Sequence, residues 1–319
     1  MKAVVIRKFG TSEVLEIETV NRPIISNDQV LIHVFYSSAN PIDWKIRNGA
    51  LRFITGSKFP MLLGFDVAGE IAETGASVTK FKKGDRVFAM LDLKHRGAYA
   101  EYACARENTV ALIPENVDFK EAAAIPLTAL AAYQALHHKC RIKSGETVLI
   151  NGASGGVGSF AIQIAKATGA NVTAVCSTRN TELVRSLGAD KVIDYTKQNF
   201  TQLPDRYDII FDTAGKLSFF RISKNLTSSG RYITTLPNKP TDVLSFFLTP
   251  FLSLFGYRKK STFLNVKSSG SDLNNIAHLI RQKKVIPLID RVYNLEEIKE
   301  AHTYSETGHA RGKIVIKIL

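Results

Sequence analysis

Short apolar runs rich in β-branched residues recur through the first 110 or so positions of the chain. Examples are Val4–Ile6, Val30–Val34, Val67–Ala72 and Arg86–Ala89, separated by clusters of Gly, Pro, Asn and Asp. Runs of this length between turn-forming residues are typical of strands. The N-terminal third is therefore predicted to be a compact β domain.

Near Lys120 the pattern changes to helical spacing, in the alanine-rich segment Lys120–His138, which Pro126 interrupts. Residues 147–235 then alternate between continuous apolar strands and helices, which is typical of a parallel sheet covered on both faces. The predicted strands are Thr147–Asn151, Asn171–Cys176, Lys191–Asp194, Tyr207–Asp212 and Arg231–Thr235, and the helices are Ser159–Thr168, Thr181–Leu187 and one reaching about Leu226.

The segment Val243–Tyr257 is unusually apolar and is followed directly by Arg258, Lys259 and Lys260. Pro250 interrupts it, which predicts two short helices. Farther on, Asp272–Lys284 and Leu295–Thr303 have amphipathic helical spacing, the second with Asn294 as its cap, and Lys313–Leu319 alternates like a strand.

Length and composition describe an ordinary globular protein. The 319 residues suggest about two domains, and 45 % are hydrophobic and 22 % charged. Cys104, Cys140 and Cys176 are far apart, which disfavours a disulfide framework and a zinc finger and favours a reducing compartment. With neither a secretory signal at the start nor an apolar run of about 18 residues, we expect a cytoplasmic protein.

The formal net charge is +13 at pH 7. Such an excess would suit nucleic acid, anionic lipid or a polyphosphate ligand, but it is also compatible with a merely basic surface. The chain has no RNA-binding module pattern or arginine-rich tail, and its basic residues are scattered. Nucleic acid is therefore a disfavoured partner.

The segment TVLINGASGGVGSFAIQIAKATGA runs from a strand through a glycine-rich turn into a helix. Ala153, Gly155 and Gly158 occupy the three positions of the dinucleotide fingerprint. Gly155 would let the backbone approach a pyrophosphate, and Gly158 would let helix and strand pack closely. The N–H groups of Gly156 and Val157 would face the phosphate oxygens, with Ser154 in the same turn. The alternative is a turn with a structural role only.

The second strand of this alternation ends in Ser177, Thr178, Arg179 and Asn180, without the carboxylate that usually holds the ribose of NAD. Ser177 and Thr178 can donate hydrogen bonds, and Arg179 can pair with a phosphate. These residues predict NADP(H) as the cofactor. The alternative for Arg179 is a solvated residue at the start of a helix.

With these residues the chain resembles the medium-chain dehydrogenase/reductase family, in its zinc-free quinone oxidoreductase branch. Within that branch it most resembles the enone/alkenal oxidoreductases and the chloroplast-envelope-type quinone oxidoreductase homologues. The matching segments span nearly the whole chain: NPIDWKIRNG, LLGFDVAGEIAETG, KKGDRVFA, GAYAEY, AAAIPLTALAAYQAL, INGASGGVG, LGADKVIDY, FDTAG and GHARGKIVI. The resemblance implies an α/β fold with a GroES-like β domain (1–122, completed by 268–319) and a Rossmann NADP-binding domain (123–267).

The resemblance also places the family's zinc ligands. The corresponding positions are Asn40, Phe65 and Ala124, with Asp66 in place of a nearby Glu, and the first three are not a plausible ligand set. We therefore expect no metal. Hydride from a nicotinamide would then need an acceptor that is already electrophilic, such as a quinone or a C=C conjugated to a carbonyl.

By resemblance, Asn40, Asp43 and Lys45 lie at the substrate and nicotinamide end, where Lys45 contacts the cofactor. The other implied cofactor contacts are Thr128 at the nicotinamide amide, Tyr195 near the 2′-phosphate, Leu236 along the nicotinamide, and Arg311 and Gly312 from the C-terminal segment. Plainer alternatives stay open: a turn at Asn40, a helix cap at Asp43 and a solvated charge at Lys45. The proton would come from water.

The sequence therefore predicts an NADPH-dependent, zinc-independent quinone or enone reductase. The alternative is an RNA-binding or membrane-associated protein of the same fold with little or no reductase activity. A homodimer is predicted, with the strand Thr262–Lys267 as its contact. The apolar segment would cover the substrate cleft or join the dimer contact; the alternative is peripheral membrane contact through Val243 to Lys260.

Overall fold

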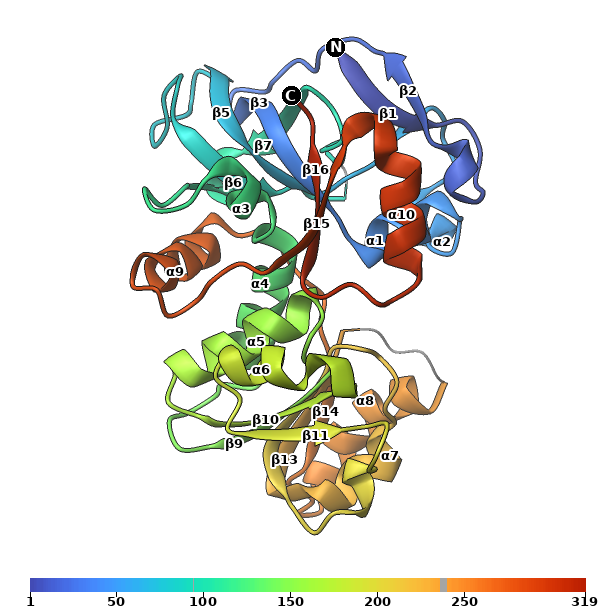
Figure 1. Ribbon diagram of the computed structural model, residues 1–319, viewed down its shortest axis with the longest axis vertical. Coiled ribbons are helices and arrows are strands. Elements are labelled where there is room, and N and C mark those ends of the chain that lie inside the picture. Colours follow the sequence, from blue (N-terminus) through green and yellow to red (C-terminus); the bar gives the residue numbers. More distant parts are fainter. Residues whose placement is uncertain (94, 236–239) are drawn as a thin grey trace. The chain divides into compact units, whose positions relative to one another are not determined.

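The computed structural model describes residues 1–93, 95–235 and 240–319. The chain forms two compact units. The first comprises Met1–Leu130, Lys267–Gln282 and Pro287–Leu319, and the second comprises Ala131–Val266 and Lys283–Ile286. Figure 1 colours the chain from blue to red, so that the first unit combines blue and red segments while the second is mainly green to orange.

The described part of the first unit is built around two sheets. A three-stranded antiparallel sheet has the order β2-β1-β4, and a seven-stranded sheet has the order β15-β16-β3-β5-β6-β8 with β7 paired to β3. The strands are β1 (Lys2–Ile6), β2 (Glu16–Thr19), β3 (Gln29–Ala39), β4 (Met61–Leu62), β5 (Asp66–Thr74), β6 (Arg86–Met90), β7 (Tyr102–Arg106), β8 (Val110–Leu112), β15 (Ile289–Asn294) and β16 (Lys313–Lys317).

The C-terminal strand β16 completes the larger sheet. It pairs antiparallel with β3, placing Ile314 opposite Ala39 and therefore the start of β16 beside Asn40. The helices that accompany these sheets are α1 (Pro41–Arg47), α2 (Arg52–Thr55), α3 (Phe119–Ala123), α9 (Gly270–Arg281) and α10 (Ile298–Glu306); α4 (Pro126–Tyr133) runs from the first unit into the second.

The second unit contains a parallel sheet with the strand order β11-β10-β9-β12-β13-β14. This is the order of a doubly wound nucleotide-binding sheet, in which ligands bind where the order reverses, here between β9 and β12. The predicted α/β class is confirmed. The elements are β9 (Thr147–Asn151), α5 (Gly156–Ala167), β10 (Asn171–Cys176), α6 (Thr181–Ser186), β11 (Lys191–Asp194), β12 (Tyr207–Asp212), α7 (Phe219–Ile222), β13 (Leu226–Thr234), α8 (Pro240–Ser253) and β14 (Lys260–Phe263).

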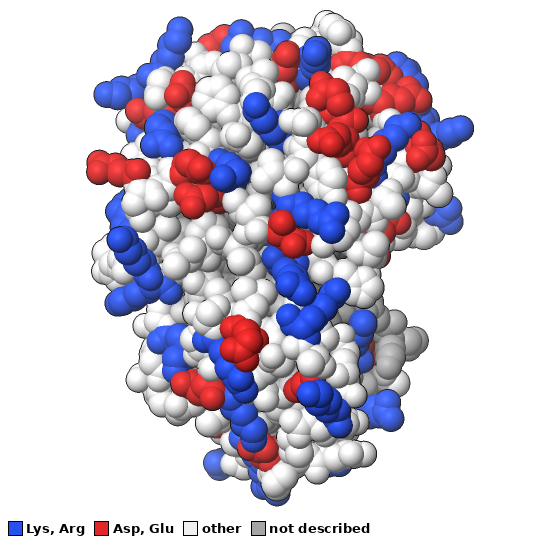
Figure 2. Space-filling view, in the orientation of Figure 1, with Lys and Arg blue, Asp and Glu red and all other residues white. Residues whose placement is uncertain are grey.

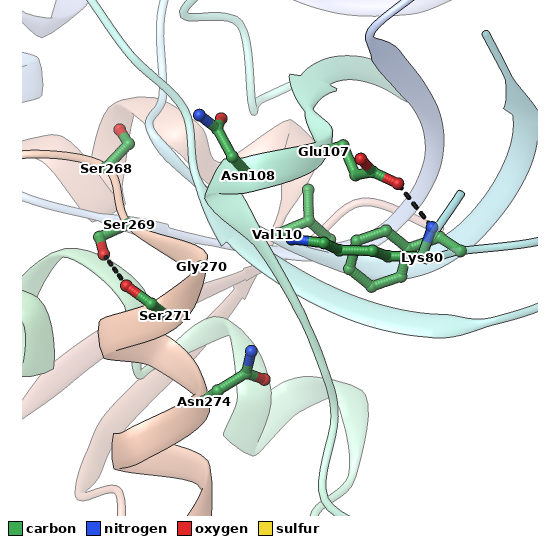
Figure 3. A pocket seen from close by; sticks show the side chains of 10 residues that line it. Lys80, Glu107, Asn108, Val110, Ser268, Ser269, Gly270, Ser271 and Asn274 are labelled. Atoms are coloured by element: carbon green, nitrogen blue, oxygen red, sulfur yellow. Dashed lines mark hydrogen bonds between the residues drawn. The ribbon is translucent and has the colours of Figure 1, made fainter. Parts of the chain in front are cut away.

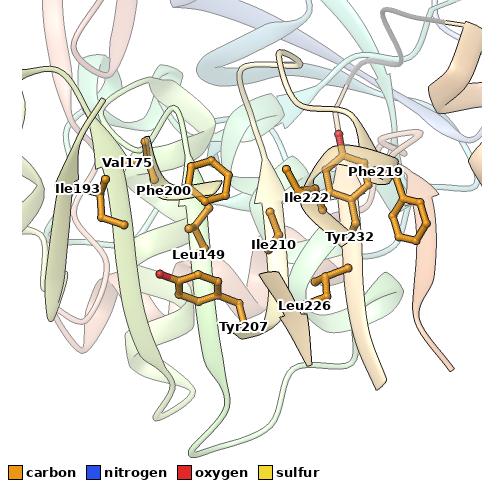
Figure 4. Packing of buried hydrophobic residues seen from close by; sticks show 10 residues of the cluster. All are labelled: Leu149, Val175, Ile193, Phe200, Tyr207, Ile210, Phe219, Ile222, Leu226 and Tyr232. Carbon is orange, nitrogen blue, oxygen red and sulfur yellow. The ribbon is translucent and has the colours of Figure 1, made fainter. Parts of the chain in front are cut away.

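A cluster of buried side chains packs on this sheet and holds its strands in place. It takes Leu149, Val175 and Ile210 from β9, β10 and β12, and Phe219 and Ile222 from α7. Figure 4 shows these side chains over the strands, together with Tyr207 and Tyr232. The continuous apolar runs of the sequence are therefore strands buried inside the unit.

Some predicted elements differ from the structure. The helix predicted to follow β12 and reach about Leu226 begins only at α7, because the Asp212 carboxylate accepts the N–H of Leu217 at 2.8 Å and holds the preceding segment as a loop. A 3-10 turn, Ser223–Asn225, continues α7 as far as Leu226. The edge strand β14 ends at Phe263, earlier than the predicted Thr262–Lys267.

The prediction of two helices around Pro250 was also wrong, because α8 continues through that residue. Proline removes one backbone hydrogen bond from a helix interior. Here Pro250 lies in the last turn, and Thr249 just before it accepts the N–H of Ser261 in β14 at 3.1 Å, which attaches the helix to the sheet.

Within the described residues, none of the helices combines the length and hydrophobicity required to cross a bilayer.

Candidate functional site

The glycine-rich turn between β9 and α5 presents backbone donors at the carboxyl edge of the parallel sheet. Gly155 is the N-cap of α5, and Gly156, Val157 and Gly158 form its first turn. Their N–H groups have no acceptor inside the helix, and the helix dipole makes this end favourable for an anion. A Cβ at Gly155 would come no closer than 3.5 Å to the nearest atom, so the residue leaves open space there.

Gly158 has a different function. A Cβ at this position would lie 2.3 Å from the carbonyl oxygen of Gly152 and 2.7 Å from the Cα of Ala153. Only glycine lets α5 approach the end of β9 this closely. The packing role that the fingerprint predicts for Gly158 therefore agrees with the geometry.

Asn180 joins the glycine turn to the loop after β10. Its Nδ2 donates to Ser154 Oγ at 2.8 Å and to Ser177 Oγ at 3.3 Å, and its side chain is buried. Because both serine oxygens accept here, each hydroxyl keeps its hydrogen for another acceptor. Asn180 was not among the predicted site residues, because its position before α6 is that of an ordinary helix-start residue.

The three neighbouring candidates after β10 differ in what their side chains do. Thr178 donates its hydroxyl hydrogen to Asp194 Oδ2 at 2.5 Å, and this bond is the main reason that the pKa of Asp194 is lowered. Ser177 is half-buried, and Arg179 is exposed. The hydroxyl hydrogen of Thr178 is therefore engaged by Asp194, and Ser177 and Arg179 remain the candidates for a phosphate.

Tyr195 follows β11 at the same edge of the sheet. Its backbone N–H donates to the carbonyl of Cys176 at 3.0 Å, while its side chain is 63 % exposed. The turn, the Ser177–Asn180 loop and Tyr195 therefore lie together at the carboxyl ends of β9, β10 and β11. Leu236 lies outside the described residues.

In the first unit, Asn40 and Asp43 form the start of α1. The backbone N–H of Asn40 donates to Asp43 Oδ2 at 2.8 Å, and Gly64 N–H donates to Asp43 Oδ1 at 3.1 Å. Both side chains are fully buried. The helix-cap alternative for Asp43 is the arrangement found, and it fixes the helix that carries Lys45.

The Asn40 amide is held between two buried charges. Its Nδ2 donates to Asp66 Oδ2 at 2.8 Å, and its Oδ1 accepts from Lys313 Nζ at 2.5 Å. Lys313 also donates to Asp66 Oδ2 at 3.2 Å, and the two side chains are 2 % and 0 % exposed. Buried charges need such pairing, because an unpaired ion in this environment is strongly unfavourable. Lys313 was missed, since a lysine that opens a C-terminal strand gives no sign of burial.

The positions implied for zinc ligands do not fit the metal. The Asn40 amide is occupied by Asp66 and Lys313, and Phe65 and Ala124 are buried apolar side chains. Among the described residues, no three His, Cys, Asp or Glu side chains form a group that could hold a metal ion.

Burial raises the pKa of the Asp43 carboxyl from its ordinary 3.8 to about 7. The backbone N–H of Asn40 and the Tyr99 hydroxyl lower it, and the neighbouring Asp66 raises it further. Near neutral pH the carboxyl of Asp43 is therefore partly protonated in the folded chain. Its burial leaves it without direct access to solvent.

The remaining candidates of the first unit have distinct surroundings. Lys45 is half-buried, and burial lowers the pKa of its ammonium. The Thr128 hydroxyl is buried and donates back to the carbonyl of Ala124 at 3.3 Å. Gly312 has φ +92°, and a Cβ there would lie 2.3 Å from Leu288 O, so glycine is required for the fold; Arg311 before it is exposed.

A cavity of about 370 Å³ lies elsewhere in the first unit, between the segment at Glu107 and the start of α9. Figure 3 shows Lys80, Glu107 and Ser269 around it. The Glu107 carboxylate accepts the N–H groups of Thr79 and Lys80 at 2.6 Å each. None of the predicted site residues lines this cavity.

Two family profiles match the chain. Residues 26–115 match an alcohol dehydrogenase GroES-like domain, and residues 187–316 match a zinc-binding dehydrogenase domain. The chain is 36 % identical to a chloroplastic quinone-oxidoreductase homologue of Spinacia oleracea, over 97 % of this chain and 95 % of the relative. It is also 36 % identical to a chloroplastic NADPH-dependent alkenal/one oxidoreductase of Arabidopsis thaliana, over 99 % and 79 %.

A solved quinone oxidoreductase from Coxiella burnetii has a TM-score of 0.90 and 31 % identity, covering 100 % of this chain and 99 % of the other. The chain thus belongs to the medium-chain dehydrogenase/reductase superfamily, and the predicted GroES-like and Rossmann architecture is confirmed. Within the superfamily it groups with proteins named quinone oxidoreductases and alkenal/one oxidoreductases.

The raised pKa of Asp43 predicts a pH-dependent stability. Between about pH 4 and pH 7 the folded chain keeps a proton on Asp43 that the unfolded chain releases. The stability that this proton contributes is fully present below pH 3.8 and is lost as the pH rises through about 7. The wild type should therefore lose stability relative to Asp43→Asn as the pH rises from about 4 to 7. The difference between their free energies of unfolding should fall by up to ~1.4 kcal/mol per pH unit.

Urea unfolding at a series of pH values measures this difference. The control is Asp28→Asn, at an exposed position. The free energy of unfolding of the wild type minus that of this control should not fall in the same way between pH 4 and pH 7. A difference between wild type and Asp43→Asn that is the same at pH 4 and pH 7 would show that Asp43 is not protonated in the folded chain.

Proposed function

We propose that the chain is an NADPH-dependent reductase that works without zinc and transfers hydride to quinones or to the C=C of α,β-unsaturated carbonyls. The observation that carries this proposal is the anion site of the second unit: the α5 N-terminus is fixed by Asn180 next to Ser177 and Arg179. The names of the relatives support the same activity.

The residues of the second unit fit a dinucleotide with a phosphorylated ribose. The N–H groups of Gly156, Val157 and Gly158, with the Ser154 hydroxyl, would hold the pyrophosphate. Ser177 and Arg179 would hold the 2′-phosphate, with the exposed Tyr195 ring alongside and Thr178 positioning the loop. Arg179 supplies a planar cation that binds phosphate through two hydrogen bonds. The bound cofactor supplies a hydride.

The first unit would supply the substrate end. Lys45 has a half-buried ammonium that can face negative charge developing on a carbonyl or quinone oxygen. Asn40 and Asp43 are buried, so they would position α1 rather than touch substrate. Thr128, Leu236, Arg311 and Gly312 remain proposed cofactor contacts.

The domain limits are part of this proposal: 1–122 with 268–319 for the GroES-like domain, and 123–267 for the NADP-binding domain.

The absence of suitable zinc ligands among Asn40, Phe65 and Ala124 limits the acceptors. Without a metal to polarise a simple carbonyl or to activate an alcohol, the substrate must itself stabilise the charge that hydride addition creates. Conjugated enones and quinones do this by delocalisation. Simple alcohols do not, which is why alcohol oxidation is not part of the proposal.

The alternative of an RNA-binding protein lacks a supporting surface on the face that Figure 2 presents. There Lys and Arg side chains are interspersed with Asp and Glu rather than gathered in one patch. Nucleic-acid binding depends on a basic stripe that follows the phosphates. The reductase is therefore the better supported function.

Assembly and location are also proposals. Strand β14 is the edge of the parallel sheet. Thr249 of α8 accepts the Ser261 N–H on its outer side, and the outer side beyond Ser261 would pair with β14 of a second copy in a homodimer. Because the Leu264 N–H donates to Thr234 O in β13, the N–H of Phe263 alternates to the outer side of β14. Replacing Phe263 by proline should therefore convert a dimer to a monomer in sizing chromatography; a wild-type chain that is already monomeric would refute the contact. We propose a cytoplasmic location and a peripheral membrane contact through Val243 to Lys260.

A substrate panel tests the proposed reaction. NADPH oxidation should be rapid with a naphthoquinone, a short enone or a long alkenal, and should be absent with saturated aldehydes of the same length. NADP⁺ should not be reduced in the presence of simple alcohols. Turnover of alcohols, or activity that a metal chelator abolishes, would contradict the proposed chemistry.

Arg179→Ala should weaken the preference for NADPH. Losing a hydrogen-bonded ion pair costs about 1.5–3 kcal/mol, so the KM for NADPH should rise roughly tenfold to a hundredfold while the KM for NADH changes little. Steady-state kinetics with a saturating quinone measures both constants. Arg206→Ala, at an exposed position of the same unit, is the matched control. If the KM for NADPH and the KM for NADH change by the same factor, Arg179 does not bind the 2′-phosphate.

A further inference from the structure

Helix α8 has its polar side buried and its apolar side exposed. Val243, Leu244, Phe247, Phe251 and Leu254 recur at helical spacing, and all of them are exposed, Phe247 to 74 % and Leu254 to 78 %. Surface helices normally bury the apolar side. An apolar face of this size that is left exposed marks an interaction site.

The orientation of α8 is fixed by polar contacts with β14. Ser245 Oγ and Ser261 Oγ lie 2.7 Å apart, and Thr249 Oγ1 accepts the N–H of Ser261 at 3.1 Å. Asp242, Ser245 and Thr249 are each no more than 2 % exposed. Turning the helix to hide its phenylalanines would break these buried contacts, which would leave unsatisfied polar groups. The apolar face is therefore presented by the fold itself.

Aromatic rings extend this face beyond the helix end. The rings of Phe251 and Phe255 are 5.5 Å apart, and Phe255 is 75 % exposed. Helix α7 packs against α8 and adds the exposed Phe220. We call these exposed side chains the α8 face: Val243, Leu244, Phe247, Phe251, Leu254, Phe255 and Phe220.

Basic residues border the α8 face. Arg258 and Lys260 are exposed after it, and Arg221 and Lys224 are exposed beside Phe220. Lys259 donates to the carbonyl of Ser223 at 2.6 Å, which holds this basic cluster beside the end of α7. Residues 243–267 contain no Asp or Glu. The border of the face is thus positively charged.

We propose that the α8 face docks peripherally on an anionic membrane surface. Phenylalanine and leucine side chains would enter the interface while Arg221, Arg258 and Lys260 meet lipid phosphates. The charge distribution argues against a second copy as the occupant. In a two-fold symmetric contact through this face, residues 243–267 of the second copy would offer no acidic side chain to pair Arg221 and Arg258.

This inference deepens the membrane contact proposed above and does not depend on reductase activity. A lipid-soluble quinone or alkenal would reach an enzyme held at the membrane more readily than one in bulk water. The interaction is peripheral, because it uses one face of a 14-residue helix.

Vesicle co-sedimentation of the full chain tests the proposal. At low salt it should pellet with vesicles of phosphatidylcholine mixed with phosphatidylglycerol, and much less with phosphatidylcholine alone. The double variant Phe247→Ser/Phe251→Ser should reduce the partition coefficient about tenfold or more. Arg258→Glu with Lys260→Glu should reduce it on the anionic vesicles and remove most of its salt dependence.

The matched control is Phe53→Ser/Ile54→Ser, which replaces two exposed apolar side chains on α2 and should leave binding unchanged. Unfolding midpoints verify that all variants are folded. No pelleting with anionic vesicles overturns the proposal, as does pelleting that Phe247→Ser/Phe251→Ser leaves intact. A dimeric wild type that this double variant converts to a monomer would assign the face to a second copy and would also overturn it.

Discussion

A side chain at Gly158 would collide with the carbonyl oxygen of Gly152, so the first turn of α5 rests on the end of β9 only because glycine stands there. That close packing points the helix N-terminus at the carboxyl edge of the sheet, where strand order reverses. Asn180 then ties the turn to the loop after β10 through Ser154 and Ser177. The proposed cofactor site of the second unit depends on this geometry, because the pyrophosphate and ribose-phosphate donors belong to different loops.

The first unit is organised around a buried ion pair. Lys313 and Asp66 neutralise each other, and the Asn40 amide lies between them. Asp43 then holds the start of α1 through the backbone of Asn40 and Gly64. Of the three positions implied for zinc ligands, Asn40 therefore belongs to a closed hydrogen-bond network, and Phe65 and Ala124 are buried apolar side chains. An electrophilic acceptor is the chemistry that such a site leaves available.

Local features were readable from the sequence, and long-range side-chain contacts were not. Strand and helix alternation and the glycine turn depend on neighbouring residues, and the α/β class is confirmed. Asn180 contacts Ser154 across 26 positions and Lys313 contacts Asn40 across 273, so no spacing indicated either pair. Which side of α8 packs on β14 could not be read from its apolar run: the serine and threonine side is buried, and the apolar side is exposed. Pro250 suggested a break that these contacts prevent.

The most direct test of the central claim is the affinity of the purified chain for NADPH and for NADH, titrated without substrate. Because Ser177 and Arg179 are assigned to the 2′-phosphate, NADPH should bind at least about tenfold more tightly at low salt. Added salt should reduce the ratio between the affinities for NADPH and NADH, because it screens the charge of the 2′-phosphate. Equal affinities, tighter binding of NADH, or no binding of either nucleotide would contradict the assignment of this edge of the sheet to a phosphorylated dinucleotide.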